Sequence, residues 1–130
     1  SIHFSLLGKA ILHKNSEHGK KYLKLAEQMY THQVTQAHPS FGYPKFNAYY
    51  GLANLKLIEF SIDNTPTSEQ KIEIIQLLKK AIEFGFRETT FLNTNQLFKQ
   101  VKSDGDFIDL IEQIKQLNQI ELDKLQTMQL

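Results

Sequence analysis

Residues 77–107, LLKKAIEFGFRETTFLNTNQLFKQVKSDGDF, decide most about the fold of this chain. Apolar residues recur there at helical spacing as far as Gly85, and a glycine in this place suits the left-handed conformation that ends many helices. Short helical turns are expected at about 88–92 and 96–100. A last long helix is expected from Ser103 or Asp104 to near Thr127. Its apolar residues form one stripe, which breaks phase beyond Ile120, so the tail is expected to fray or to pack elsewhere; the stripe consists of Phe107, Leu110, Ile111, Ile114 and Leu117. The stretch therefore predicts a helix that stops, two short turns and a final helix.

The rest of the chain also has the pattern of helices. Only six Gly and three Pro interrupt its 130 residues, and the β-branched alternation typical of strands is missing. Helices are expected at about 2–14, 17–32, 44–61 and 69–83. The Thr-rich cluster at Asp63–Ser68 is expected to form a loop that caps the last of these. The helices form two antiparallel pairs, at about 2–32 and 44–84, separated by a loop at 33–43 and followed by a closing segment at 85–130. With 41% hydrophobic residues, the expected fold is one all-α domain spanning 1–130.

Small residues set the register of the two pairs. Gly8 and Ala26 in the first pair, and Ala53 and Ala81 in the second, let facing helices approach closely. This pattern resembles the tetratricopeptide-repeat (TPR) family, whose helix pairs stack into an α-α superhelix. The spacing between the small residues is longer in the second pair than in the family.

The opening stretch is similar to the end-of-group closing module that follows TPR-like pairs in many bacterial proteins. The residues that carry this resemblance are Ala81-Ile82-x-x-Gly85-Phe86 and Phe98-x-x-Val101-Lys102-x-Asp104-Gly105-x-Phe107. Gly105 replaces the Pro of that module, Val101 its Leu and Lys102 its Arg. The resemblance implies a C-terminal capping helix, with Phe86, Phe98, Val101 and Phe107 sealing the open hydrophobic end of the stack.

Composition excludes several function classes. Fifteen Lys and Arg against fourteen Asp and Glu leave a net charge of +1, which gives no global field for nucleic acid. Four lysines at 14, 20, 21 and 24 are interleaved with acidic residues, so we interpret them as a solvated helix face. No apolar run approaches the roughly 20 residues that span a bilayer. No membrane insertion is expected, and the compartment stays open between cytoplasm and periplasm.

No residue set specifies a reaction. The chain has no Cys, which excludes disulfides and thiolate chemistry. His13 and His18 lack a metal-binding spacing, and the acidic group at Asp104, Asp106 and Asp109 is better explained by helix capping than by calcium. We therefore expect no catalytic residues, no metal and no cofactor.

The TPR resemblance implies that the first helix of each pair lines a concave binding surface. Carried onto this chain, it nominates Ser5, Lys9 and Leu12 from the first helix, and Tyr50, Asn54 and Leu57 from the third. Tyr43 and Asn47 extend this group, since rigid aromatic residues flanked by amides suit peptide recognition. The alternative is that Tyr50 only packs on a neighbouring helix pair.

The leading hypothesis is a non-catalytic protein-protein interaction module that holds a peptide or protein partner against the first-helix face. One alternative is a C-terminal accessory domain of a larger bacterial hydrolase or peptidase. Another is an immunity or inhibitor-type protein that plugs one partner. Ser1 fits a processed protein, a trimmed one or part of a longer chain, and the oligomeric state stays open.

Overall fold

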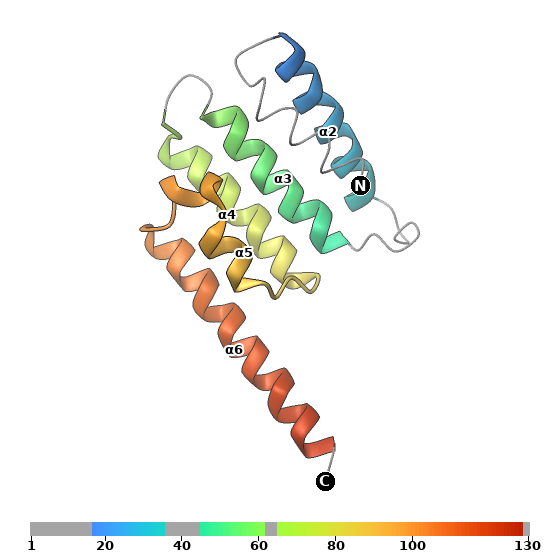
Figure 1. Ribbon diagram of the computed structural model, residues 1–130, viewed down its shortest axis with the longest axis vertical. Helices are drawn as coiled ribbons and strands as arrows, with labels where there is room; N and C mark the ends of the chain where they lie inside the picture. Colours follow the sequence, from blue (N-terminus) through green and yellow to red (C-terminus); the bar gives the residue numbers. More distant parts are fainter. Residues whose placement is uncertain (1–16, 36–44, 62–64, 129–130) are drawn as a thin grey trace.

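The structure is a computed structural model that describes residues 17–35, 45–61 and 65–128. Every regular element within these ranges is helical, which confirms the all-α class. The helices are α2 (Glu17–Thr35), α3 (Lys45–Phe60), α4 (Ser68–Glu83), α5 (Thr89–Thr94), the 3-10 helix η1 (Gln96–Gln100) and α6 (Gly105–Met128) (Figure 1). The helix expected at 2–14 lies outside the described residues.

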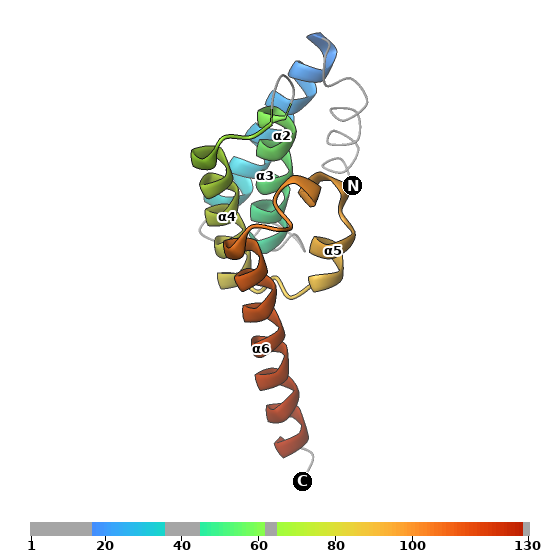
Figure 2. The same cartoon turned by 90° about the vertical axis from the view of Figure 1, so that its left-hand side faces the viewer.

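Three helices form the body of the domain. α2, α3 and α4 lie side by side with α3 in the middle, and successive helices run in opposite directions (Figure 1). α5 and η1 cover one side of this layer, and α6 packs beside α4 before continuing past the body (Figure 2). The expected antiparallel pairing at about 44–84 corresponds to α3 and α4, but α3 packs on α2 as well.

The second expected helix was placed too short. α2 continues through Thr35, although residues 33–35 were expected to begin the loop at 33–43. Val34 packs against a hydrophobic cluster, and Thr35 Oγ1 donates a hydrogen bond to the carbonyl oxygen of His32 at 3.0 Å. Because no Gly or Pro occurs between His32 and Pro39, nothing in the sequence stops the helix at His32.

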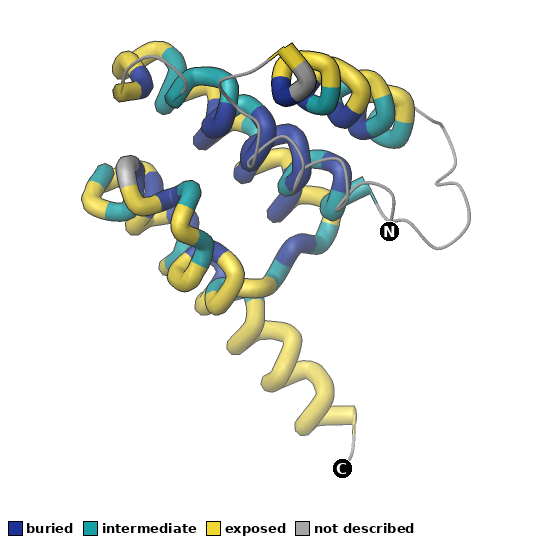
Figure 3. The backbone as a smooth tube through the Cα atoms, turned by 45° about the horizontal axis from the view of Figure 1, so that its top comes forward, coloured by how far each residue is buried: buried dark blue, intermediate teal, exposed yellow. Residues whose placement is uncertain are grey.

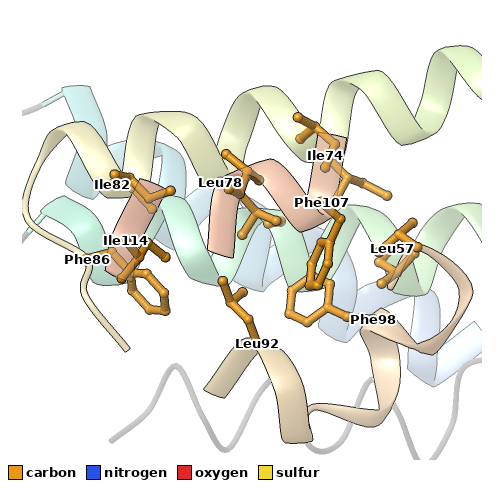
Figure 4. Close-up of a cluster of buried hydrophobic side chains, with 14 residues drawn as sticks. Leu57, Ile74, Leu78, Ile82, Phe86, Leu92, Phe98, Phe107 and Ile114 are labelled. Atoms are coloured by element: carbon orange, nitrogen blue, oxygen red, sulfur yellow. The ribbon is translucent and has the colours of Figure 1, made fainter. Parts of the chain in front are cut away.

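The larger hydrophobic cluster joins α3 and α4 to the closing segment, which contains α5, η1 and α6 (Figure 4). All four residues assigned to the seal are at most 1% exposed, namely Phe86, Phe98, Val101 and Phe107. Their burial as core residues is therefore confirmed. The apolar stripe of α6 is confirmed too, since Phe107, Leu110 and Ile114 are buried and Ile111 and Leu117 are half-buried.

Local sequence signals fix both ends of α4. Thr67 precedes the helix and accepts a hydrogen bond from the backbone N–H of Gln70, whose side chain accepts one from Thr67 N–H in return. This capping box confirms the expected N-terminal cap in the Thr-rich loop. After α4, Gly85 has φ 118°, so the predicted left-handed stop is also confirmed.

A second cluster holds α2 against α3. Its buried members are Leu23, Ala26, Tyr30, Ala48, Leu52, Leu55 and Ile58. The ring of Tyr30 lies directly over Gly51, where an added Cβ would overlap its atoms. Since Ala26, Ala48 and Ala53 are fully buried as well, small residues let the helix backbones approach closely.

Within residues 17–35, 45–61 and 65–128, no helix combines the length and the apolar character that crossing a bilayer would need.

Candidate functional site

Two of the residues predicted to contact a partner are in the protein interior. Asn54 is 3% exposed and Leu57 is 1% exposed, while Asn47 and Tyr50 are half-buried. Leu57 belongs to the core shared with α4. The assignment of Asn54 and Leu57 to an open binding face must be corrected, because the domain's own residues already cover them. Ser5, Lys9, Leu12 and Tyr43 lie outside the described residues.

Asn95, between α5 and η1, makes the polar contacts that cover this face. Its Nδ2 donates to Asn54 Oδ1 at 2.6 Å and to Tyr50 Oη at 3.0 Å. Its Oδ1 accepts the backbone N–H of Leu97 at 3.0 Å, which caps η1. Asn54 Nδ2 in turn donates to the carbonyl oxygen of Tyr50 at 2.8 Å. Asn54 and Tyr50, which were expected to contact a peptide, thus contact the chain's own closing segment.

Aromatic contacts fix the same segment. The ring of Tyr50 stacks on Phe86 with centroids 4.8 Å apart and an interplanar angle of 21°. Phe98 and Phe91 approach Tyr50 at 6.0 and 6.3 Å. Burial raises the pKa of the Tyr50 phenol above its ordinary value of 10.0, and the hydrogen bonds with Asn95 and Asn54 offset this only in part. The phenol therefore stays protonated at neutral pH.

The Tyr50–Asn54–Asn95 network has a structural role on this geometry. Neutral amides and a protonated phenol supply neither a strong base nor an activated nucleophile. Sequence reasoning found Tyr50 and Asn54 but missed Asn95. Its signal was available, since Asn directly before a short helical turn is a preferred N-cap.

Ion pairs of Lys56 link α3 to α2 on another side of the molecule. Lys56 Nζ lies 3.7 Å from Glu27 Oε1 and 3.5 Å from Glu59 Oε2. Burial opposes the charged form of Lys56, but the carboxylates of Glu59, Glu27 and Glu73 together raise its pKa above 10.5. Glu59 Oε2 is buried without a hydrogen bond, so the nearby ammonium offsets the cost of burying that oxygen.

Shallow depressions on the surface give no sign of a reaction centre. One lies between the first turns of α4 and α6, where Lys71 Nζ is 3.9 Å from Asp104 Oδ2. Another follows the outer face of α2 along Lys24, Gln28 and His32. In the part of the chain that the structure describes, no group of three or more His, Asp or Glu side chains is arranged to hold a metal ion.

The most distinctive surface is the end of α6. We call residues 118–128 the α6 extension. Every residue in it is exposed, and it projects away from the body (Figures 2 and 3). It carries large apolar side chains with high exposed fractions: Ile120 51%, Leu122 48%, Leu125 56% and Met128 80%. The sequence prediction that the tail beyond Ile120 frays is wrong, because residues 121–128 stay helical. They are also exposed, so they do not pack elsewhere on this domain.

Comparison of the chain with protein-family models, with curated proteins and with solved structures finds no match.

Proposed function

We propose that this protein is a non-catalytic protein-protein interaction module and that its contact surface is the α6 extension. The observation that carries the proposal is the exposure of four large apolar side chains on a helix that has left the body of the domain. Single exposed apolar residues are ordinary, but several on one short projecting element are typical of interaction surfaces.

The phase of the helix supports this assignment. Leu125 lies about five helical turns after Phe107, and Met128 lies about five turns after Leu110. Phe107 and Leu110 are buried against the body, so Leu125 and Met128 continue the same face into solvent. The core-packing face of α6 is thus longer than the body that covers it.

Helix energetics also favour a partner here. Most helical stability in proteins comes from packing of an apolar face, and short helices without such packing are marginal in water. Arg87 anchors the root of the extension, with Nε donating to Glu121 Oε1 at 3.1 Å and its backbone oxygen accepting from Asn118 Nδ2 at 3.3 Å. Beyond Glu121, a partner that covers Leu125 and Met128 would stabilise the last two turns.

We further propose that the scaffold is TPR-like. Three features support this: the antiparallel pair α3 and α4, the fully buried Ala53 and Ala81, and the closing segment with Gly85 in the left-handed conformation. In this proposal the first-helix face of the pair is occupied by α5 and η1, so partner binding moves to α6.

Photo-crosslinking in the cell of origin tests the interaction function. A photoreactive residue in place of Leu125 is expected to give a discrete covalent adduct with a protein. Gln116 is the matched control, because it is also exposed on α6 but lies about two and a half turns earlier, on the opposite face. An absence of adduct at both positions, or the same adducts from both, would refute the proposal.

A further inference from the structure

The end of α6 has a self-complementary sequence. Residues 117–128 read LNQIELDKLQTM, and their properties match when the segment is read backwards about the midpoint between Leu122 and Asp123. Apolar residues then meet apolar ones, as Leu117 meets Met128 and Ile120 meets Leu125. Glu121 meets Lys124, and the remaining amide and hydroxyl residues meet each other. We infer that the occupant of the α6 extension is a second copy of this chain, packed antiparallel; this inference rests on the proposed function.

The spacing of these residues fits such a pairing. Leu117, Glu121, Lys124 and Met128 follow one another at intervals of about four, three and four residues, which is the spacing of a coiled-coil seam. The two central positions of this seam carry charges in place of the usual apolar side chains. They share one face, and Ile120 and Leu125 flank it on either side. The one mismatched couple, Leu122 with Asp123, lies on the far side of the helix. The mismatch therefore falls outside the contact.

Charge selects the direction of the pairing. In the antiparallel arrangement, Glu121 lies opposite Lys124 of the second copy, and the twofold symmetry gives this ion pair twice. A parallel arrangement would set glutamate against glutamate and lysine against lysine, which destabilises helix pairs. Arg87 holds Glu121 at the base of this face, so one partner of each ion pair is already in position.

The surface also has room for the second helix. A depression lined by Ile120, Asp123, Lys124, Thr127 and Met128 runs along the edge of the seam. The extension stands clear of α2, α3 and α4 (Figure 2), so two extensions can lie side by side with the two bodies at opposite ends. Leu117, which is half-buried against the core of its own domain, is the last residue of the contact at each end. A contact between identical patches closes on itself and gives a dimer rather than a chain of subunits.

Sedimentation equilibrium of the purified protein, from about 1 µM to about 1 mM, tests the inference over the range expected for a small interface. The parent chain is expected to form dimers. Lys124→Glu alone and Glu121→Lys alone are each expected to weaken the dimer about tenfold, because each places like charges opposite one another twice. An equal mixture of the two variants is expected to recover dimers, because the mixed pair restores both ion pairs.

Lys115→Glu is the matched control: it reverses a charge on an exposed residue of the same helix, on the side away from the seam, and should leave the dimer unchanged. Circular dichroism of each variant confirms that its helices remain. A parent chain that stays monomeric at all concentrations would overturn the inference. So would a dimer that responds equally to Lys124→Glu and Lys115→Glu, or a mixture that fails to recover.

The crosslinking experiment separates this inference from the proposed function. An adduct of Leu125 with another copy of the chain supports both. An adduct with a different protein, together with a monomeric parent chain, overturns the self-pairing and leaves the interaction function standing. No adduct at all overturns both.

Discussion

Replacement of Asn95 by Ala is expected to loosen the closing segment from α3. The change removes the cap of η1, which costs about 0.5–2 kcal/mol. It also removes the donor to Asn54 Oδ1, an atom of a side chain that is only 3% exposed, and an unsatisfied buried acceptor costs about 1–3 kcal/mol. The free energy of unfolding should therefore fall by about 1.5–5 kcal/mol, the sum of these two ranges, which is a large part of the 5–15 kcal/mol typical of a domain.

Urea denaturation followed by circular dichroism measures this loss, and the melting temperature should fall by about 10 °C. Asn93→Ala is the control, because Asn93 is an exposed asparagine in the adjacent α5 helix. Asn95→Asp keeps an oxygen that can cap η1 but loses the donor to Asn54, so it isolates the bridging hydrogen bonds. The reasoning is refuted if Asn95→Ala costs no more than Asn93→Ala.

A double-mutant cycle with Asn54→Ala adds a second check on the same network. Each single variant disrupts the same hydrogen bond between Asn95 Nδ2 and Asn54 Oδ1. The double variant should therefore lose less stability than the sum of the two single losses, by at least about 0.5 kcal/mol. Strict additivity would mean that the two side chains do not interact in solution.

Two further predictions concern the contact between α2 and α3. Gly51→Ala places a methyl group in the ring of Tyr30, and the overpacking cost of about 1–3 kcal/mol should outweigh a helix-propensity gain of about 1 kcal/mol. The control in the same urea titration is Gly105→Ala, whose added methyl group meets nothing within 4 Å. A Gly51→Ala variant more stable than the parent chain would contradict the packing of Tyr30 on Gly51. The ion pairs of Lys56 should contribute their full stability below pH 10.5, the ordinary pKa of lysine, and lose it as the pH rises through the higher pKa of the folded state. The difference in unfolding free energy between the parent chain and Lys56→Met should therefore shrink above pH 10.5. A constant difference would show that the charge of Lys56 does not contribute. The titration of Tyr50, whose pKa is also raised, occurs in both proteins and so cancels in this difference.

Local signals were reliable where a few neighbouring residues decide the outcome. The cap at Thr67 and the left-handed Gly85 depend on interactions within one helix turn. The sequence therefore predicted a cap within Asp63–Ser68 and a stop at Gly85, although not the capping box itself. The C-terminal end of α2 was missed because Val34 gains stability from a hydrophobic cluster formed with α3. That gain depends on a neighbour that is distant in the sequence.

The predicted binding face is a clearer case in which contacts between residues distant in the sequence could not be predicted. The sequence analysis predicted that Tyr50 and Asn54 contact a peptide or protein partner, and the residue types suit that role. It could not reveal that the segment is the chain's own, because Asn95 meets Asn54 only when α5 and η1 fold back onto α3. Residues separated by some 40 positions in the chain come within hydrogen-bonding distance at that point.

The sequence by itself determined the helical class and the stop at Gly85, because helix periodicity and turn residues act over short stretches of chain. The burial of Phe86, Phe98, Val101 and Phe107 was implied by the resemblance to a closing module. The tertiary structure decided which apolar faces are covered. Tyr50, Asn54 and Leu57 turn inward because the closing segment packs on them, while Leu125 and Met128 stay exposed because α6 is longer than the helices beside it. Burial depends on the relative lengths and positions of packed helices, and no single helix pattern contains that information.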